Sequence, residues 1–328
     1  MKNKKTFLLI RYSSLGDLIL ATPVLSCIKS NMPEAEISFL TKEKYKGVFF
    51  NNPHVGEVLN KAPFFKKFDY IVDLHNSLRS NMHKAFIYAD TRLTYNKASY
   101  ARRAFLLKGI KSDVLEKNVV RRYLDALQPE GFDTSYRSPE LYLSGPELKD
   151  AAGMVKAKKY IAIAPGAKWE TKKWTEDKYI SAVIKIIRDL ETDVVLIGDS
   201  GDEALCSRIH SGAGILNRHI TNMAGKTSLR TLFALIKNSE VLLSTDSGPM
   251  HAARALKTKT VALFGPTVRE FGFMPDEENI KIIEKPLKCR PCSLHGSSKC
   301  RYKDRACMKR IETHEVIDKI KELLYGSC

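Results

Sequence analysis

The sequence has no long hydrophobic run. Its apolar stretches are short, such as Phe7–Ile10 and Val194–Ile197, whereas a helix that spans a bilayer needs about 18 apolar residues. The N-terminus also lacks the ~7–15 uninterrupted apolar residues of a secretory signal, because Arg11 and Asp17 interrupt it. We therefore expect no transmembrane helix, no signal peptide and a cytoplasmic protein. In that compartment the seven cysteines would be reduced thiols or metal ligands rather than disulfides.

The sequence also contains no short-period repeat and no low-complexity tract. Hydrophobic residues make up 44% and charged residues 28% of the chain, which excludes a disordered chain, a collagen-like chain and a small disulfide scaffold. The charge is less ordinary, because 54 lysines and arginines outnumber 37 acidic residues and give a net charge of +17. This surplus favours a polyanionic partner, such as nucleic acid, an anionic membrane surface or a phosphorylated substrate. The alternative is a basic protein whose charges are scattered and solvated.

Strand-like and helix-like segments alternate along the chain, which is typical of α/β proteins with parallel sheets. Apolar residues recur at helical spacing between Leu15 and Ile28, and again in Leu229–Lys237 and Pro249–Leu256. The predicted strands are Thr6–Arg11, Ile37–Leu40, Tyr70–Leu74, Arg92–Tyr95, Tyr160–Ala164, Val194–Ile197, Val241–Ser244 and Thr260–Phe264.

A polar, glycine-containing stretch, Ser144–Lys159, separates two series of these strands. A chain of 328 residues is expected to form about two domains. We therefore predict two Rossmann-like domains, residues 1–150 and 151–328. The second would end in a helix at about Thr313–Leu324, which carries an apolar face and should pack on one domain or bridge both.

Three loops follow predicted strands, at the carboxyl edge where open α/β sheets bind ligands. In the first, Arg11–Asp17, Gly16 and small side chains allow another molecule to approach the backbone. Asp17 is there either a helix-capping residue, stabilised by the amides at the helix start, or a base that points into a cleft. The second loop, Pro165–Trp174, has a glycine turn and several lysines, which suits a phosphate; alternatively its two tryptophans simply pack locally.

The third loop, Ser244–His251, leads into a predicted helix. Asp246 or Ser247 can cap that helix, and Gly248 suits the tight turn before it. The free amides at the helix start can bind an anion, with His251 about one turn further on. The alternative is an ordinary capped helix with a packed histidine.

Together and in this order, these blocks resemble glycosyltransferase family 9, the ADP-heptose:lipopolysaccharide heptosyltransferases. The resemblance covers nearly the whole chain. It implies a GT-B fold, in which two Rossmann-like domains face a central cleft, the N-terminal one binding the acceptor and the C-terminal one the nucleotide sugar. The matching blocks are Arg11–Asp17, Asp73–Ser80, Pro165–Trp174, Met223–Leu229, Asp246–His251 and Phe264–Thr267.

The resemblance also implies a reaction. Heptose would move from ADP-L-glycero-D-manno-heptose to the lipopolysaccharide inner core, with inversion and with no metal or cofactor required. The acceptor would be Kdo-lipid A or a heptosyl residue at the cytoplasmic face of the inner membrane, where a basic protein can dock electrostatically; no nucleic acid would be a partner. The basic residues expected on the acceptor half are Lys61, Lys66, Lys67, Arg102, Arg103, Lys108, Arg121 and Arg122.

The resemblance assigns roles to individual residues. Asp17 matches the catalytic aspartate, which takes the proton of the acceptor hydroxyl. Lys172 matches the lysine that neutralises the donor diphosphate as the leaving group forms, and Asp246 matches the acidic residue that binds sugar hydroxyls. The other implied donor-binding residues are Thr227 at the adenine pocket, Ser247 and Gly248 at the phosphates, and His251 beside them. The implied acceptor-binding residues are Ser13, Gly16, His75, Asn76 and Arg79, the last for a phosphate or carboxylate.

Four cysteines follow one another as C-x2-C-x7-C-x6-C, and only the first pair has the close spacing of a zinc site. They could hold a structural metal or cluster with His295, remain buried thiols, or form a conditional disulfide. These cysteines are Cys289, Cys292, Cys300 and Cys307; Cys27 and Cys206 are expected to pack in helices, and Cys328 to be a free thiol.

Two other functions compete with this interpretation. One is a different nucleotide-sugar enzyme with the same fold, either a glycosyltransferase that uses another sugar or an epimerase. The other is a basic nucleic-acid-binding protein with a zinc module at Cys289–Cys307, which would bind DNA or RNA in a salt-sensitive way. Against the latter, the sequence has no recognised nucleic-acid motif and its positive charge is dispersed.

Overall fold

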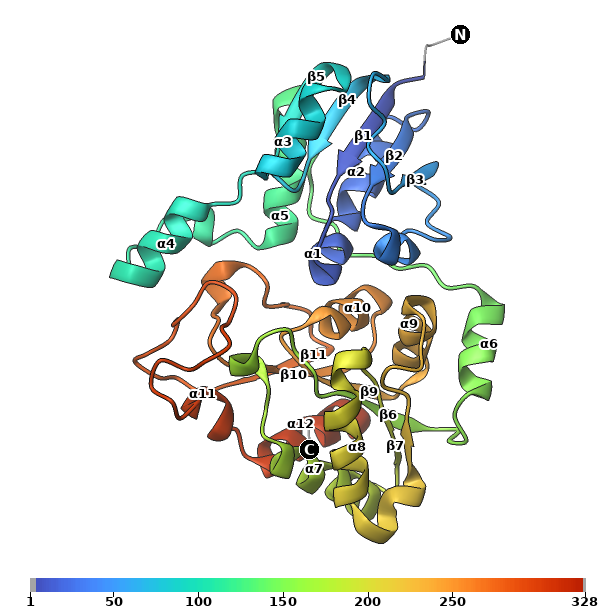
Figure 1. Cartoon of the computed structure of the whole chain (residues 1–328), viewed down its shortest axis with the longest axis vertical. Helices are drawn as coiled ribbons and strands as arrows, with labels where there is room; N and C mark the ends of the chain where they lie inside the picture. Colours follow the sequence, from blue (N-terminus) through green and yellow to red (C-terminus); the bar gives the residue numbers. More distant parts are fainter. Residues whose placement is uncertain (1–3, 327–328) are drawn as a thin grey trace. The chain divides into compact units, whose positions relative to one another are not determined.

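The chain folds into two units, each built around a parallel β-sheet (Figure 1). The structure, a computed structural model, describes residues 4–326. The first unit comprises the chain up to Tyr142 together with Glu270–Phe273. The second comprises Leu143–Arg269 and the chain from Met274 onward.

The sheet of the first unit has the order β3-β2-β1-β4-β5. Its central strand pairs in parallel with both neighbours, so that Phe7 lies opposite Ile37 and Tyr70. Phe7–Ile10 is buried throughout, as expected for a strand covered on both faces. The strands are β1 (Thr6–Ile10), β2 (Glu36–Leu40), β3 (Glu57–Leu59), β4 (Lys67–Asp73) and β5 (Tyr88–Thr94). The helices are α1 (Leu15–Leu20), α2 (Thr22–Asn31), α3 (Leu78–Ala85), α4 (Ser99–Lys108) and α5 (Val119–Leu124), with 3₁₀ turns at Glu43–Val48, Asp113–Leu115 and Asp125–Glu130.

The sheet of the second unit has the order β11-β10-β9-β6-β7-β8 and is also parallel. Its strands are β6 (Tyr160–Ala164), β7 (Asp193–Leu196), β8 (Ile220–Asn222), β9 (Val241–Thr245), β10 (Thr260–Phe264) and β11 (Ile280–Glu284). Its helices are α6 (Gly145–Gly153), α7 (Glu176–Asp189), α8 (Glu203–Gly212), α9 (Leu229–Asn238), α10 (Gly248–Leu256), α11 (Ala306–Lys309) and α12 (Thr313–Tyr325). Further 3₁₀ turns span Glu170–Lys172, Ser200–Asp202, Gly214–His219 and Arg269–Phe271.

All the strands predicted from the sequence are confirmed in position, whereas β3, β8 and β11 were not predicted. The expectation of one helix from Leu15 to Ile28 is wrong, because α1 ends at Leu20 and α2 starts at Thr22. Pro23 has no N–H for the carbonyl of Ile19, and the Thr22 hydroxyl bonds to that carbonyl instead, at 2.7 Å. The polar stretch Ser144–Lys159 is not a plain linker, since it contains α6.

The predicted C-terminal helix is confirmed as α12. Its apolar face, Val316, Ile317, Ile320 and Leu323, is buried in a core that also contains Ile161 of β6. The helix therefore packs on the second unit.

The segment Glu270–Phe273 returns to the first unit and joins α4 and α5. The amide of Val119 donates to the carbonyl of Gly272 at 2.8 Å, and Arg122 Nη2 donates to the carbonyl of Phe271 at 2.7 Å. Arg102 lies over the Phe271 ring, 5.2 Å from its centroid. Gly272 has φ +84°, and a Cβ there would approach the Val119 nitrogen to 2.9 Å, so a glycine is required.

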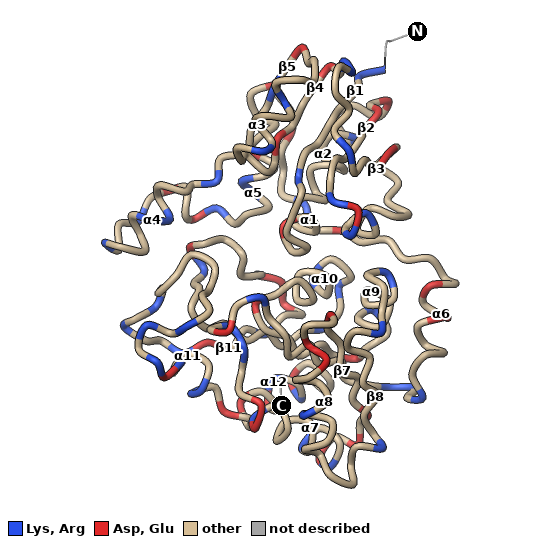
Figure 2. The backbone as a smooth tube through the Cα atoms, in the orientation of Figure 1, with Lys and Arg blue, Asp and Glu red and all other residues tan. Residues whose placement is uncertain are grey.

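No helix among residues 4–326 is both long and apolar enough to cross a membrane. Figure 2 shows Lys and Arg distributed over both units. Arg102 and Arg122, which we expected on a charged docking surface, are buried instead. They hold the returning segment just described.

The first turn of α6 contains an ion pair that should make stability depend on pH. Glu147 accepts two hydrogen bonds from Arg230, at 2.6 and 2.8 Å, and one from the Ser144 amide. The hydrogen bond from Arg230 is the main reason that the pKa of Glu147 falls to about 2. Since an unfolded glutamate has a pKa of about 4.3, this pair stabilises the fold above that pH and stops doing so as the pH falls towards 2.

We expect Glu147→Gln to lower the free energy of unfolding by about 1–2 kcal/mol at pH 7, after allowance for solvent screening. The difference from wild type should shrink as the pH approaches 3, as measured by denaturant unfolding across this range. Glu36→Gln, which removes the exposed pair with Lys4, is the control and should have little effect. An equal loss at every pH would show that the charge of Glu147 is not the cause.

Candidate functional site

Both units collect polar side chains at the carboxyl edge of their sheet, where each parallel strand ends and its loop begins. In the first unit these are the loops after β1 and β4, which are adjacent strands. In the second they are the loops after β6, β7, β8, β9 and β10. This edge is where open parallel sheets bind ligands.

Asp17 is the centre of the group after β1. Its Oδ2 accepts the Ser14 amide at 3.0 Å and the Ser14 hydroxyl at 2.7 Å, so the helix-capping role considered from the sequence is confirmed for this oxygen. Its Oδ1 lies 2.7 Å from Arg11 Nη2 and 3.4 Å from the Tyr123 hydroxyl. The side chain keeps 17% of its surface exposed.

The electrostatics of Asp17 depend on Arg11. Burial on its own would raise the pKa of Asp17, but the charge of Arg11 and the hydrogen bonds from Ser14 outweigh it and lower the pKa to about 2. Arg11 is itself buried and donates to the carbonyls of Ser13 and Leu74. The carboxylate is therefore ionised at neutral pH and fixed in direction.

The loop after β4 brings the other predicted residues of the first unit together. Asp73 Oδ1 accepts the amides of His75 and Asn76, and the Asn76 side chain donates to the carbonyl of Tyr95. Burial, reinforced by Arg11, lowers the pKa of His75 to about 4, so this imidazole is neutral at pH 7. Asn76 thus has a structural role at its side-chain nitrogen.

Tyr12 connects this loop to the one after β1. Its ring packs edge to face with His75, and the Arg79 guanidinium lies over it at 4.8 Å. Arg79 is exposed, so its charge faces solvent. Of the remaining predicted residues, Gly16 is buried within α1, and Ser13 contributes its carbonyl to Arg11.

Lys172 and Asp246 form the centre of the second group. Lys172 Nζ lies 2.5 Å from Asp246 Oδ2, and the Thr267 hydroxyl donates to the same oxygen at 2.8 Å. Burial would raise the pKa of Asp246, but Lys172 outweighs it and the pKa is lowered. Two residues that are 74 positions apart thus form one nearly buried ion pair at the sheet edge.

The loops around this pair are bonded to one another. The Thr245 hydroxyl donates to the carbonyl of Gly166 at 3.1 Å, and the hydroxyls of Ser244 and Ser247 are 3.2 Å apart. Ser247 is the N-cap residue of α10, which starts at Gly248. His251 is buried one turn further on, near enough to Asp246 to affect its pKa. Thr227 is half-buried just before α9, beyond the end of β8.

Several residues of these groups were not found by sequence reasoning. Arg11 and Thr267 lie inside the quoted motifs, but their partners are set by the fold; Tyr123 is 106 positions from Asp17 and has no motif. Glu203 is a further case, since a Cβ on Gly225 would come within 1.9 Å of its carboxylate. Gly225 has φ +70°, a backbone conformation that favours glycine, whereas the Glu203 side chain could move aside.

The cysteine segment packs against the loop that carries Lys172. Thr171 exchanges hydrogen bonds with the backbone of Ser297, and Arg290 donates to the carbonyl of Thr267. Burial raises the pKa of Cys307 to about 11. Burial also raises the pKa of Cys292. No disulfide joins the six described cysteines, and within residues 4–326 no three His, Cys, Asp or Glu side chains are arranged to hold a metal ion. Cys27 and Cys206 are buried in α2 and α8 as predicted, whereas Cys328 lies outside the described residues.

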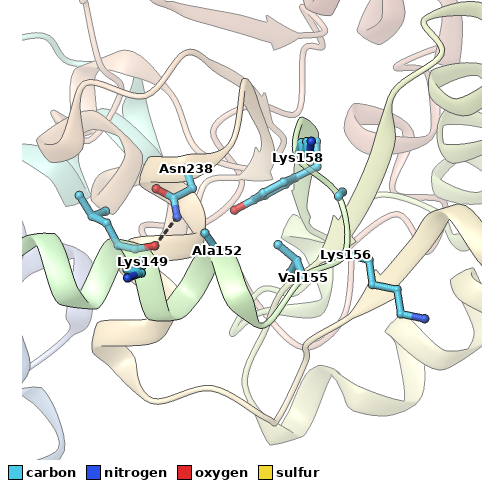
Figure 3. Close-up of a pocket in the computed structure, with 9 residues that line it drawn as sticks. Lys149, Ala152, Val155, Lys156, Lys158 and Asn238 are labelled. Carbon is cyan, nitrogen blue, oxygen red and sulfur yellow. Dashed lines mark hydrogen bonds between the residues drawn. The ribbon is translucent and has the colours of Figure 1, made fainter.

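A cavity of about 660 Å³ lies elsewhere on the second unit (Figure 3). It is lined by α6, by the loop that includes Lys156 and Lys158, by Tyr160 at the start of β6, and by Asn238 at the end of α9. Because it adjoins the start of β6, it lies at the opposite edge of the sheet from Lys172 and Asp246. It is therefore not part of the candidate site.

Comparison with known proteins gives a consistent result. The family model described as glycosyltransferase family 9 (heptosyltransferase) matches residues 61–303. Lipooligosaccharide heptosyltransferase 2 of Campylobacter jejuni is 25% identical over 95% of this chain and 96% of its own length. Lipopolysaccharide heptosyltransferase 3 of Escherichia coli K12 is 30% identical over 81% of this chain and 83% of its own.

Among solved structures, ADP-heptose LPS heptosyltransferase II of E. coli superposes with a TM-score of 0.77. It is 21% identical, and the match covers 97% of this chain and 98% of that one. This likeness, with the two parallel sheets, shows the GT-B fold.

The contact between Arg11 and Asp17 can be tested by titration. We expect Arg11→Met to raise the pKa of Asp17 from about 2 towards its ordinary value of about 3.9, because burial is then opposed only by the hydrogen bonds from Ser14. Carbon-detected NMR of the aspartate carboxyl groups, with Asp17→Asn for assignment, measures this value. Arg11→Lys should raise the pKa of Asp17 by a smaller amount. Arg92→Met should leave it unchanged, because Arg92 is an exposed arginine elsewhere in the same unit. An unchanged pKa in Arg11→Met would assign the effect to Ser14 alone.

Proposed function

Because the chain belongs to glycosyltransferase family 9, an enzyme family of heptosyltransferases in lipopolysaccharide core biosynthesis, we propose that it transfers heptose from ADP-L-glycero-D-manno-heptose to the lipopolysaccharide inner core. The acceptor is Kdo-lipid A or a heptosyl residue already attached to it. The observation that carries this proposal is the ion pair of Lys172 with Asp246 at the sheet edge. A cation and a carboxylate side by side are what a diphosphate and the hydroxyls of its sugar require.

The second unit binds the donor. An ammonium group has three N–H donors, so Lys172 can keep its contact with Asp246 and also bind the diphosphate. Charge accumulates on the leaving ADP as the anomeric bond breaks, and a cation already in place stabilises it. The amides of Ser247 and Gly248 at the start of α10 add hydrogen bonds to the phosphates, while His251 supports Asp246 from within the unit.

Asp246 receives the hydroxyl groups of the sugar. The Thr267 hydroxyl and Lys172 hold its Oδ2 and thereby fix the orientation of the carboxylate. Thr227 precedes α9 at the same sheet edge, where its backbone contacts the adenine base. The E. coli structural relative is named as an ADP-heptose LPS heptosyltransferase, which supports this choice of donor.

Asp17 of the first unit takes the proton of the acceptor hydroxyl. The acceptor oxygen attacks the anomeric carbon, the bond from that carbon to the phosphate oxygen breaks, ADP leaves, and the configuration is inverted. A carboxylate with a pKa of about 2 is a weak base, so the proton moves only when the attacking hydroxyl has become acidic in the transition state. Arg11 and Ser14 hold the carboxylate in position for that transfer.

Other groups of the first unit bind the acceptor. The exposed guanidinium of Arg79 meets a phosphate or carboxylate of the inner core. His75 is neutral and therefore contributes hydrogen bonds rather than charge, with Asn76 and the Ser13–Gly16 backbone beside it. The diphosphate charge is met by Lys172 and the amides of α10, so the reaction needs no metal ion. The enzyme works at the cytoplasmic face of the inner membrane, where this acceptor lies.

Donor selectivity is the experiment that tests the proposal. Isothermal titration calorimetry should show selective binding of ADP-heptose over UDP- and GDP-sugars, in the presence of a chelator. Binding of a different nucleotide sugar with no response to ADP-heptose would leave the fold and reject heptose as the transferred group.

In the same calorimetric titration, Lys172→Met should weaken the binding of ADP. In an assay of heptose transfer, the same variant should be slower by roughly 100-fold, the typical effect of losing one electrostatic contact in the transition state. Lys168→Met is the matched control, because Lys168 is an exposed lysine of the same loop that lies over the Trp169 ring. If the two variants behave alike, Lys172 does not contact the diphosphate.

Asp17→Asn should lower kcat by about 100-fold or more, since a general base contributes ~10²–10⁴. Donor affinity should stay near the wild-type value, because Asp17 belongs to the first unit and the donor groups to the second. Stopped assays of heptose transfer and the calorimetric titration measure the two quantities. Retention of kcat within tenfold of wild type would remove Asp17 from the role of base.

A further inference from the structure

Helix α3 of the first unit has its polar side turned inward and its apolar side turned outward. Leu78, Met82 and Phe86 recur every four residues, which places them on one side of the helix. Their exposed fractions are 79%, 58% and 53%. In a surface helix of a globular protein the apolar side normally faces the core, so this arrangement needs an explanation.

Polar contacts hold the helix in this orientation. Lys84 lies 2.7 Å from the buried carboxylate of Asp73, and His83 Nδ1 lies 2.7 Å from the Tyr12 hydroxyl. Ser80 is buried and bonds to the N-cap residue Ser77. These contacts fix α3 against the β4–β5 side of the sheet (Figure 1). The outward direction of the apolar side is therefore determined by the protein and is not an accident of a mobile helix.

A neighbouring turn extends the same apolar surface. The Phe64 ring packs edge to face on Phe86, with the centroids 6.0 Å apart, and the Phe65 amide donates to the carbonyl of Phe86 at 2.8 Å. Phe65 is 72% exposed and has φ +62°, a left-handed conformation that is unfavourable for a bulky side chain. Phe64 and Phe65 thus enlarge the exposed apolar surface of α3 into a contiguous patch, which is typical of a contact outside the chain.

Exposed cations lie close to this surface in the sequence. Lys61 and Lys66 come before and after the two phenylalanines, and Arg79, whose guanidinium lies over the Tyr12 ring, follows Leu78. Apolar and aromatic side chains bordered by lysine and arginine are typical of segments that lie in the interface of an anionic bilayer. The long stems of such cations can lie along the lipid while their charges reach the headgroups.

We propose that the outer face of α3, defined as Leu78, Met82 and Phe86 with Phe64 and Phe65, inserts into the interfacial layer of an anionic lipid bilayer. The proposal rests on the proposed function in one respect, because a lipid-linked acceptor gives a reason for the contact. The apolar row on α3 is only ~12 Å long, from eight steps of 1.5 Å. A row of this length covers much less than the roughly 800 Å² per partner that a stable protein interface typically buries. It is sufficient for interfacial anchoring.

This contact would place the acceptor close to its base. Tyr12, which bonds to His83 on the inner side of α3, is the neighbour of Arg11, and Arg11 holds Asp17. A single helix, about 10–12 Å across, thus separates the lipid from the loop that carries Asp17. Sugars attached directly to a membrane lipid would extend over this distance.

Co-sedimentation with vesicles tests the proposal without any donor or acceptor. Wild-type protein should bind vesicles that contain phosphatidylglycerol more strongly than vesicles of pure phosphatidylcholine, and less strongly at high salt. Phe65→Ser/Leu78→Ser/Met82→Ser should lower the partition coefficient by about tenfold or more, given the apolar area removed from the interface. Lys61→Glu/Lys66→Glu should abolish the preference for phosphatidylglycerol.

The matched control is Met154→Ser/Ile215→Ser/Tyr302→Ser, which removes exposed apolar side chains of the second unit and should bind as wild type does. All replaced side chains are exposed, so the melting temperature should not change. Equal partition of the α3 variant and wild type would overturn the proposal. The proposal would also be overturned if wild type did not bind vesicles but formed a dimer that the α3 variant does not form. In that case the face would join two copies of the chain.

Activity separates this proposal from the proposed function. The α3 variant should keep wild-type kcat/KM with a deacylated, water-soluble acceptor and lose activity with the acylated acceptor in vesicles. If wild type binds vesicles through α3 but does not use ADP-heptose, the proposed function fails and the docking surface stands. If wild type and the α3 variant use ADP-heptose equally well with the vesicle-bound acceptor, the docking surface fails and the function stands.

Discussion

The parallel pairing of the strands is the constraint on which the rest of this structure depends. Every parallel strand delivers the loop that follows it to the same edge of the sheet. Because β6 lies beside β9 and β9 beside β10, Lys172, Asp246 and Thr267 meet although they are far apart in the sequence. The same constraint in the first unit brings the loops after β1 and β4 together. The chemistry of each unit thus follows from strand order.

Both sites use charges that are already neutralised within the protein. A buried carboxylate without a partner would be strongly destabilised or protonated. Arg11 beside Asp17 and Lys172 beside Asp246 remove that cost and keep both carboxylates ionised. The orientation of each carboxylate is also fixed, because one of its oxygens accepts hydrogen bonds from hydroxyl or amide donors. A substrate therefore meets groups whose orientation is set before it arrives.

The sequence was informative where burial was complete and less so elsewhere. Strands such as Tyr160–Ala164 are covered on both faces and appear as continuous apolar runs, so they could be predicted. The unpredicted strands β3, β8 and β11 lie at sheet edges, where fewer residues need to be apolar. Motifs located Asp17, Lys172 and Asp246, but no local pattern shows that the last two form an ion pair. Nor could a hydrophobic pattern reveal α3, where the apolar side points away from the core.

The return of Glu270–Phe273 to the first unit has a consequence for biosynthesis. A ribosome makes the chain from its N-terminus, and domains generally fold as they emerge. The first unit, however, includes Phe271, which accepts a hydrogen bond from the buried Arg122 and lies under Arg102. A nascent chain that ends at Tyr142 has both arginines but not the segment that covers them. The N-terminal unit is therefore completed only after most of the C-terminal unit has been translated, so the two must mature together.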